Sequence, residues 1–469
     1  MAIDQPAFEA LAAGVFRQLQ GDELATLWLE AERSGFVRIN RARLRQAGET
    51  TRPLLSLRLA RGARQATWSV VLTGRAGEDQ ATLAAALARL RAELDDAVED
   101  PYLLIARGPA RSRSAAALAA PDAIELAQAL ARQAHGLDLV GFVTSGPLAR
   151  AFASGATGAA SAGRGDDGPG DGAGDAEALH WFEAASGFID YSIYRSPHRA
   201  LKATLAGPDL GTDLAAAVDA IARSMEQSAR IARWLDLPAV DVPTGEHRAL
   251  LEPAAVAELL SMFQWDGFSM RAHRTRSSPL WRLHDGQARL DPRVSLAEAP
   301  AEGGAPRFSA DGFLAPDRLP LIDAGGPGAL LVSARTEREF GVPNNGAPPH
   351  ESPQSLSMAA GELADADALA ALGTGLWIPN LWYLNWSDRS GARITGMTRF
   401  ATLWVRDGKV VGPVAPLRFD DSVWRLFGSA LEALGATPRF MPDTSTYDGR
   451  NTGSIRAPSM LLRALRITL

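Results

Sequence analysis

The side chains that could carry out hydrolytic chemistry are few in this chain, and they are scattered. The 469 residues include seven His and no Cys, which excludes thiol nucleophiles, disulfides and Cys-ligated zinc. No two His stand four residues apart. A metal site would have to combine isolated His with Asp or Glu, and the candidates for such an atypical site are His273, His284 and His350.

The dipeptide His350-Glu351 invites comparison with the zinc-peptidase motif H-E-x-x-H, in which one helix face presents two imidazoles to a metal. Here Gln354 stands four residues after His350, and Pro353 precedes it. Because Pro disrupts helix interiors, we predict a loop without a zinc site. Residues 163–168 match G-x-G-x-x-G. A dinucleotide site requires this motif to follow a strand and to open a helix, and we predict neither element here.

Arg residues are concentrated near the N-terminus. Residues 33–64 contain nine Arg and one acidic residue, Glu49. Such a strand face could contact phosphates. A single Phe lies among these Arg, which is too little for stacking on bases. We therefore favour a solvated surface and do not expect nucleic acid to be a direct ligand.

The composition is that of a globular protein with several domains. Hydrophobic residues make up 46% and charged residues 22% of the chain, and the net charge is −6, so no global attraction to nucleic acid or anionic membranes is expected. The first residues lack the basic and apolar segments of a signal peptide. No uncharged apolar run is long enough to span a membrane. We expect a cytoplasmic protein without a membrane partner.

Hydrophobic periodicity predicts an α+β fold with N-terminal α/β domains and a β-rich C-terminal domain. In the first domain, residues 1–118, we predict a helix over 8–31 and strands at 35–40, 55–59 and 66–72. The apolar spacing of Leu83, Leu87, Leu90 and Leu94 predicts one face of a further helix.

The second predicted domain covers residues 119–240. We predict a helix over 122–135, strands at 139–144, 188–194 and 200–205, and a helix from Thr212, which is a good N-cap. Residues 154–176 are mostly Gly, Ala, Asp and Ser, so we predict a disordered loop there.

The third predicted domain, residues 241–469, opens with a helix at Pro253 and then becomes rich in strands. The pairs Asp285-Gly286 and Asp407-Gly408 predict hairpin turns. We also predict a helix over 422–434 and a final strand over 460–469.

Several segments, in order along the chain, resemble the TldD/PmbA family. Residues 251–260 are similar to the helix that opens the last domain of that family. Residues 308–333 and 396–414 are similar to two of its later segments; the second holds Thr398-Arg399-Phe400, the Asp407-Gly408 turn and Pro413-Val414. The N-terminal strand-plus-helix unit and residues 188–194 also fit the domain order of the family.

The resemblance implies a barrel-like C-terminal domain and a role in peptide hydrolysis. In this family the TldD-type member is a zinc peptidase with H-E-x-x-x-H on a helix, whereas the TldE/PmbA-type member lacks the motif and pairs with it to cleave unfolded peptides. The matching helix here, within residues 250–268, contains Glu252, Glu258 and Asp266 but no His, and the motif occurs nowhere in the chain. Carboxylates without imidazole make a poor zinc site.

We therefore expect a TldE/PmbA-like, non-catalytic subunit without a cofactor of its own. Its expected partners are a zinc-containing TldD-type peptidase, in a heterodimer, and an unfolded peptide. Arg399 is expected as a polar anchor or in a structural salt bridge. The expected peptide-binding or interface residues are Trp377, Met397, Thr398, Arg399 and Phe400.

Two alternatives stay open. One is a stand-alone metal-dependent peptidase with an atypical site built from His273, His284 or His350. The other is a regulatory binding protein that uses the Arg-rich face of residues 33–64.

Overall fold

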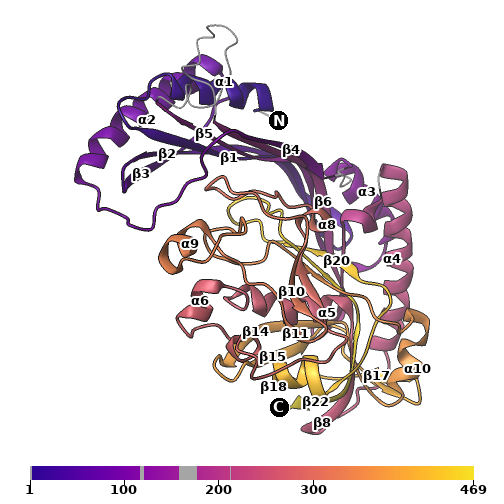
Figure 1. Cartoon of the computed structure of the whole chain (residues 1–469). Helices are drawn as coiled ribbons and strands as arrows, with labels where there is room; N and C mark the ends of the chain where they lie inside the picture. The colour runs from indigo at the N-terminus through magenta and orange to yellow at the C-terminus, as the bar shows by residue number, and fades with distance from the viewer. Residues whose placement is uncertain (1–2, 117–120, 158–176, 212) are drawn as a thin grey trace.

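The computed structural model describes residues 3–116, 121–157, 177–211 and 213–469. These residues form three β-sheets with helices against and between them (Figure 1). No helix in the described ranges is long and apolar enough to cross a membrane. The predicted α+β class is confirmed. The barrel-like shape is wrong, because both C-terminal sheets are open and their end strands do not pair with each other in the part of the chain described.

The N-terminal sheet has seven strands in the order β3-β2-β1-β5-β6-β4, with β7 also paired to β6. Strand β1 pairs antiparallel with both β2 and β5. The strands of the first and second predicted domains therefore belong to one sheet. The domain boundary at residue 118 stays a prediction. The strands are β1 (Leu24–Asn40), β2 (Arg43–Arg61), β3 (Arg64–Val71), β4 (Ala110–Ala116), β5 (Asp138–Ala156), β6 (Ala178–Ser196) and β7 (Arg199–Ala206).

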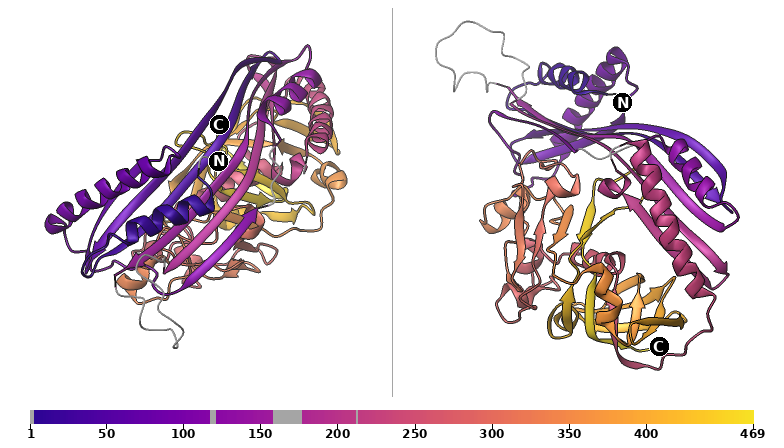
Figure 2. Two further views of the ribbon diagram at one scale, coloured as in Figure 1. Left: turned by 90° about the horizontal axis from the view of Figure 1, so that it is seen from above. Right: turned by 90° about the vertical axis from the view of Figure 1, so that its right-hand side faces the viewer.

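One face of this sheet is covered by helices, as Figure 2 shows. The predicted leucine stripe lies on α2 and is buried against α1, β1 and β2. Helix α4 begins after Asp213, whose side chain accepts a hydrogen bond from the Ala216 N–H at 2.9 Å; the predicted cap, Thr212, lies outside the described residues. The helices are α1 (Gln5–Phe16), α2 (Ala76–Asp96), α3 (Ala123–Gln133) and α4 (Leu214–Leu235).

Two N-terminal predictions need correction. The helix expected over 8–31 is wrong beyond Phe16, since residues 24–31 begin strand β1. There Leu27 and Leu29 point into the helix-covered core, while Trp28 and Glu30 lie on the other face, as strand geometry requires. The expected disordered loop over 154–176 falls mostly outside the described residues, but residues 154–156 complete β5.

The C-terminal domain has a nine-stranded sheet in the order β14-β15-β18-β22-β8-β13-β16-β17, with β19 paired to β22, and a six-stranded sheet in the order β11-β10-β9-β12-β21-β20. The strands of the larger sheet are β8 (Gly245–Leu251), β13 (Gly375–Ile378), β14 (Asn380–Asp388), β15 (Arg393–Arg399), β16 (Leu403–Arg406), β17 (Lys409–Pro413), β18 (Arg418–Ser422), β19 (Leu431–Leu434) and β22 (Met460–Ile467). Those of the smaller sheet are β9 (Leu296–Glu298), β10 (Leu319–Asp323), β11 (Gly326–Pro327), β12 (Ser355–Met358), β20 (Arg439–Pro442) and β21 (Ser454–Ala457).

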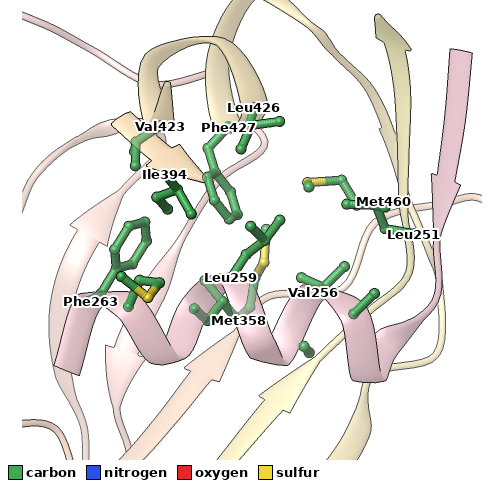
Figure 3. Close-up of a cluster of buried hydrophobic side chains, with 14 of the residues drawn as sticks. Leu251, Val256, Leu259, Phe263, Met358, Ile394, Val423, Leu426, Phe427 and Met460 are labelled. Carbon is green, nitrogen blue, oxygen red and sulfur yellow. The ribbon is translucent and has the colours of Figure 1, made fainter. Parts of the chain in front are cut away.

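Helix α5 (Pro253–Ser261) packs in the core shared by the two C-terminal sheets (Figure 3). Its Val256 and Leu259 are buried with Met358 of β12 and Ile394 of β15. Pro253 occupies its first turn, as predicted. Short helices complete the domain: η3 (Met262–Gln264), α6 (Met270–Arg274), α7 (Trp281–His284), α8 (Pro300–Gly303), α9 (Ala334–Phe340) and α10 (Ala368–Leu372).

The C-terminal turn predictions have mixed outcomes. Asp407 and Gly408 connect β16 to β17 with φ of +49° and +72°, so this hairpin is confirmed. Asp285-Gly286 follows helix α7 and forms no hairpin. The helix expected over 422–434 is wrong, because its apolar residues serve a π-helical turn (Arg425–Ser429) and strand β19, which pairs with β22. The final strand is confirmed as β22.

Arg450 ties the C-terminal domain to the N-terminal sheet. It lies in the β20–β21 loop and is buried. Its guanidinium donates to Ser34 Oγ at 2.8 Å, to Gly146 O at 2.7 Å and to Ser186 O at 2.6 Å, on β1, β5 and β6. Its backbone N–H donates to Glu32 Oε2 at 2.7 Å. Burial lowers the pKa of Arg450 to about 10, so the side chain is a cation at neutral pH.

Replacing Arg450 with Met should loosen this contact. The variant loses the side-chain bonds to three strands and leaves buried carbonyl groups unpaired, so we expect a loss of about 2–4 kcal/mol in the free energy of unfolding. Thermal unfolding and limited proteolysis of the β20–β21 loop measure this. The control is Arg75→Met, which changes an exposed Arg. Equal unfolding midpoints for the two variants would contradict the role given to Arg450.

Candidate functional site

A cleft of about 640 Å³ lies between the N-terminal sheet and the C-terminal domain. Its floor is the sheet face opposite helices α1 to α4, with Trp28 and Glu30 of β1 and Arg150 of β5. The remaining walls are C-terminal. They include Gln264, Trp265, Glu298, Phe308, Asn345, His350, Asp443 and Asn451.

Strand register explains the composition of the floor. Glu30 stands opposite Arg150, and Trp28 opposite Phe152, across the antiparallel β1–β5 pair. Directly opposed residues on one sheet face lie close enough to interact. Trp28 also meets Phe308 of the C-terminal domain edge-on, with ring centroids 5.9 Å apart. The floor thus has an aromatic part beside a charged part.

Arg150 is the buried cation of the cleft, with 10% of its side chain exposed. Its Nη1 donates to Ala149 O at 3.0 Å and its Nη2 to Arg450 O at 3.3 Å. Its Nε lies 3.4 Å from Glu30 Oε1, and 41% of the Glu30 side chain is exposed. Burial lowers the pKa of Arg150, while Glu30 and Glu32 oppose that shift. The guanidinium is therefore held mainly by neutral carbonyl groups.

Glu298, at the end of β9, is the buried carboxyl of the opposite wall, with 7% exposure. It accepts hydrogen bonds from the backbone N–H groups of Gln354 at 3.0 Å and Ser355 at 3.1 Å. Burial nevertheless raises the pKa of Glu298 to about 7. At neutral pH this carboxyl is partly protonated, and its protonated form can donate a hydrogen bond to a ligand.

The helical segment α5–η3 leads into the cleft at Gln264 and Trp265. Gln264 Nε2 donates to Pro353 O at 3.2 Å, and Trp265 is 52% exposed. An amide and an indole stand where this segment meets the cleft. No three His, Asp or Glu side chains gather to hold a metal ion in the ranges that the structure describes.

The predicted peptide-binding or interface residues do not line this cleft. Trp377 is buried; its Nε1 donates to Glu252 at 2.5 Å, and its ring meets Trp234 edge-on. Thr398 is also buried. Its N–H donates to Leu417 O at 2.8 Å and its Oγ1 accepts from the Leu417 N–H at 2.9 Å. Both side chains stabilise the nine-stranded sheet and its surroundings.

Arg399 lies in an aromatic surface patch on β14 and β15. Its guanidinium is 4.1 Å from the ring centre of Trp382, which is 47% exposed, and 5.1 Å from that of Phe400. Arg399 takes part in no ion pair among the described residues. Met397 is half-buried and pairs with Trp382. An interface role for Met397, Arg399 and Phe400 stays a prediction.

Two of the three candidate metal ligands come together. The rings of His273 and His284 are 5.7 Å apart between centroids. His284 Nε2 lies 3.3 Å from Gly267 O, and burial lowers the pKa of His284 to about 4. Both His belong to the α6–α7 region, whereas His350 lines the cleft from a loop.

The His350-Glu351 segment is a loop, as predicted. Glu351 is buried and accepts hydrogen bonds from Ser269 Oγ at 2.6 Å, Arg271 N at 2.9 Å and Ser333 N at 2.8 Å. This carboxylate therefore connects the first turns of α6 and α9.

The basic N-terminal segment forms the β1–β2 hairpin. Arg33 pairs with Glu49 at 3.1 Å. The other Arg of the hairpin end are exposed: Arg38, Arg41, Arg43 and Arg45. This exposure agrees with the prediction that the Arg-rich strand face is solvated.

Sequence reasoning missed the cleft residues Trp28, Arg150, Trp265 and Glu298. The alternation around Trp28 and Glu30 was available as a signal, but these residues were assigned to a helix. Arg150 and Glu298 belong to different sheets, and no local pattern joins them.

The chain is thus of a class in which a cleft lies between a helix-covered N-terminal sheet and a two-sheet C-terminal domain. The family model of the PmbA/TldA metallopeptidase C-terminal domain matches residues 244–469. Residues 244–469 therefore form a C-terminal domain of the PmbA/TldA type. A search of curated proteins found no match.

Solved structures with this fold cover the whole chain. TldE from Thermococcus kodakarensis has a TM-score of 0.74 and 14% identity, covering 99% of this chain and 100% of that one. A candidate modulator of a DNA gyrase from Thermotoga maritima has a TM-score of 0.72 and 15% identity, covering 98% and 100%. A similar candidate modulator from Bacteroides thetaiotaomicron has 0.69 and 16%, covering 100% of both chains. At these identities the matches show the fold.

The pKa of Glu298 predicts a pH-dependent stability difference. Its value rises from 4.5 to about 7 on folding, so between these values the folded state binds more protons, and rising pH lowers the free energy of unfolding. Glu298→Gln removes this titration. Relative to the unmodified chain, the variant should gain stability from about pH 5 to about pH 8, by up to about 3 kcal/mol.

Thermal unfolding across that pH range measures the difference between Glu298→Gln and the unmodified chain. Glu226→Gln, at an exposed position on α4, is the control. A difference that stays constant with pH would show that Glu298 does not titrate as stated.

Proposed function

We propose that this chain is a non-catalytic, TldE/PmbA-like subunit that pairs with a TldD-type zinc peptidase, and that its cleft receives part of an unfolded peptide. The observation that carries the proposal is the cleft itself. It has about 640 Å³ of space, aromatic and polar walls, and Gln264 and Trp265 at the end of the helical segment that enters it. This volume lies in the range of small-ligand and peptide pockets.

The chemistry of the walls supports binding and does not favour zinc-dependent hydrolysis. A peptidase of the zinc type needs a metal to lower the pKa of its attacking water. Glu30, Glu298 and His350 line the cleft, but they join no group of three potential ligands in the described part of the chain. The zinc and the activated water are therefore assigned to the partner. TldE from Thermococcus kodakarensis has the same fold.

Aromatic walls are suited to binding unfolded peptides of varied sequence. Trp28, Trp265 and Phe308 offer flat apolar surfaces that accept many side chains. An extended peptide can add backbone hydrogen bonds, which do not depend on sequence. The cleft would then hold and orient the peptide while the partner cleaves it.

Co-expression with a TldD-type protein from the same genome tests the pairing. We expect the two chains to co-elute in size-exclusion chromatography and to cleave an unfolded substrate, with neither chain active alone. The reason is that each chain supplies a part that the other lacks. Peptidase activity from this chain alone, or failure of the two chains to associate, would refute the proposal.

A pair of Trp variants tests whether the cleft handles the peptide. Trp265→Ala removes an exposed cleft wall and should lower kcat/KM of the assembled pair by about tenfold, the effect of losing one good apolar contact. Trp68→Ala is the comparison, because Trp68 is also an exposed Trp but lies on β3, outside the cleft and away from the patch around Arg399. It should leave kcat/KM of the assembled pair unchanged. Full activity of Trp265→Ala would contradict the placement of the peptide.

A further inference from the structure

The negative charge near the buried guanidinium of Arg150 only partly balances its positive charge. Its side chain is nine-tenths buried, yet Glu30 is the one carboxylate within ion-pair distance in the described part of the chain, at 3.4 Å. Its Nη groups donate to two backbone carbonyl groups, of Ala149 and Arg450. Taking a cation out of water is costly unless it is well paired. A further anion beside this guanidinium would therefore be bound favourably.

The surroundings of Arg150 also carry an excess of positive charge. Arg450 lies beside Arg150: burial is the main cause of the lowered pKa of Arg450, the charge of Arg150 adds to it, and Glu32 opposes it. Arg52 is a third cation beside Glu32, and its guanidinium donates to Asp448 O. Three Arg thus face two carboxylates, Glu30 and Glu32. The Glu30 side chain is partly exposed toward the cleft, so it can move aside for a ligand.

We propose that Arg150 is a specificity-determining residue of the cleft and binds a carboxylate of the bound peptide, either an Asp or Glu side chain or the C-terminal carboxylate. This inference rests on the proposed function. The planar guanidinium matches a carboxylate with two parallel hydrogen bonds. The peptide side chain next to that carboxylate packs on Trp28 of the cleft floor and on Phe308 of the adjoining wall.

The opposite wall is compatible with an acidic ligand. Glu298 is the buried carboxyl there, and its partial protonation near neutral pH reduces its repulsion of an anion. Asp443 also lines the cleft but is exposed to solvent, which weakens its field.

Peptide binding to the purified full-length chain tests the proposal. Three fluorescein-labelled unstructured peptides of equal length are compared by fluorescence anisotropy: one with an internal Glu and an amidated C-terminus, one with Gln and a free C-terminus, and one with Gln and an amidated C-terminus. At least one carboxylate peptide should bind about tenfold tighter than the neutral peptide, the effect of one charge-assisted contact. The better of the two identifies the source of the carboxylate.

Two variants with opposite expected effects make the test specific. Arg150→Met keeps the apolar stem and should abolish the preference for a carboxylate. Glu30→Gln removes the internal competitor and should tighten binding of the preferred peptide several-fold. A merely structural Arg150 would not produce this gain. Arg195→Met, which changes an exposed Arg of β6 paired with Asp236, is the matched control. Arg150→Lys replaces Arg150→Met if the latter fails to fold, and should weaken the preference.

The outcomes separate this inference from the proposed function. Equal binding of neutral and carboxylate peptides, or an unchanged preference in Arg150→Met, overturns the role of Arg150 even if the assembled pair is an active peptidase. Absence of binding by all three peptides also overturns it. The proposed function is judged independently, by activity of the assembled pair on a substrate without acidic residues.

Discussion

The burial of Arg450 between three strands of the N-terminal sheet is the contact on which the functional geometry depends. Its guanidinium donates hydrogen bonds to residues of β1, β5 and β6, and its backbone N–H donates to the Glu32 carboxylate. These bonds hold the β20–β21 loop against the sheet. Because Asp443, Asn451 and Thr452 of the same loop line the cleft, the contact that joins the two parts of the molecule also shapes the space between them.

The two faces of the N-terminal sheet have different tasks. Leu27 and Leu29 of β1 are buried with α1 and α2 on one face. The alternating residues Trp28 and Glu30 line the cleft on the other face. This division follows from the period of two along a strand. The helices pack on one face and stabilise the sheet. The opposite face, which they do not cover, contacts the C-terminal domain and can contact a ligand.

The sequence predicted those parts of the fold whose signals are local. The leucine stripe of α2, Pro253 at the start of α5 and the Asp407-Gly408 turn were all found, since each depends on residues within one or two turns of chain. The segments 24–31 and 422–434 were misassigned as helices. In both, tertiary pairing with distant strands overrides an ambiguous apolar pattern.

The candidate site was harder to predict than the fold, because it is assembled from distant segments. Arg150 and Arg450 are 300 residues apart in the chain and meet only in the folded state. Trp377 and Thr398 were selected because they lie in a recognisable segment, yet they stabilise the C-terminal sheet. A recognisable sequence segment can therefore reflect packing as readily as ligand contact.

The central claim is that this chain shapes a peptide cleft and leaves the catalytic metal to its partner. Zinc analysis of this chain alone and of the assembled pair, after dialysis against metal-free buffer, tests it most directly. The account predicts that the pair retains about one zinc per TldD-type chain and that this chain alone retains none, because its cleft offers no imidazole cluster. One zinc per chain retained by this polypeptide alone would contradict the account.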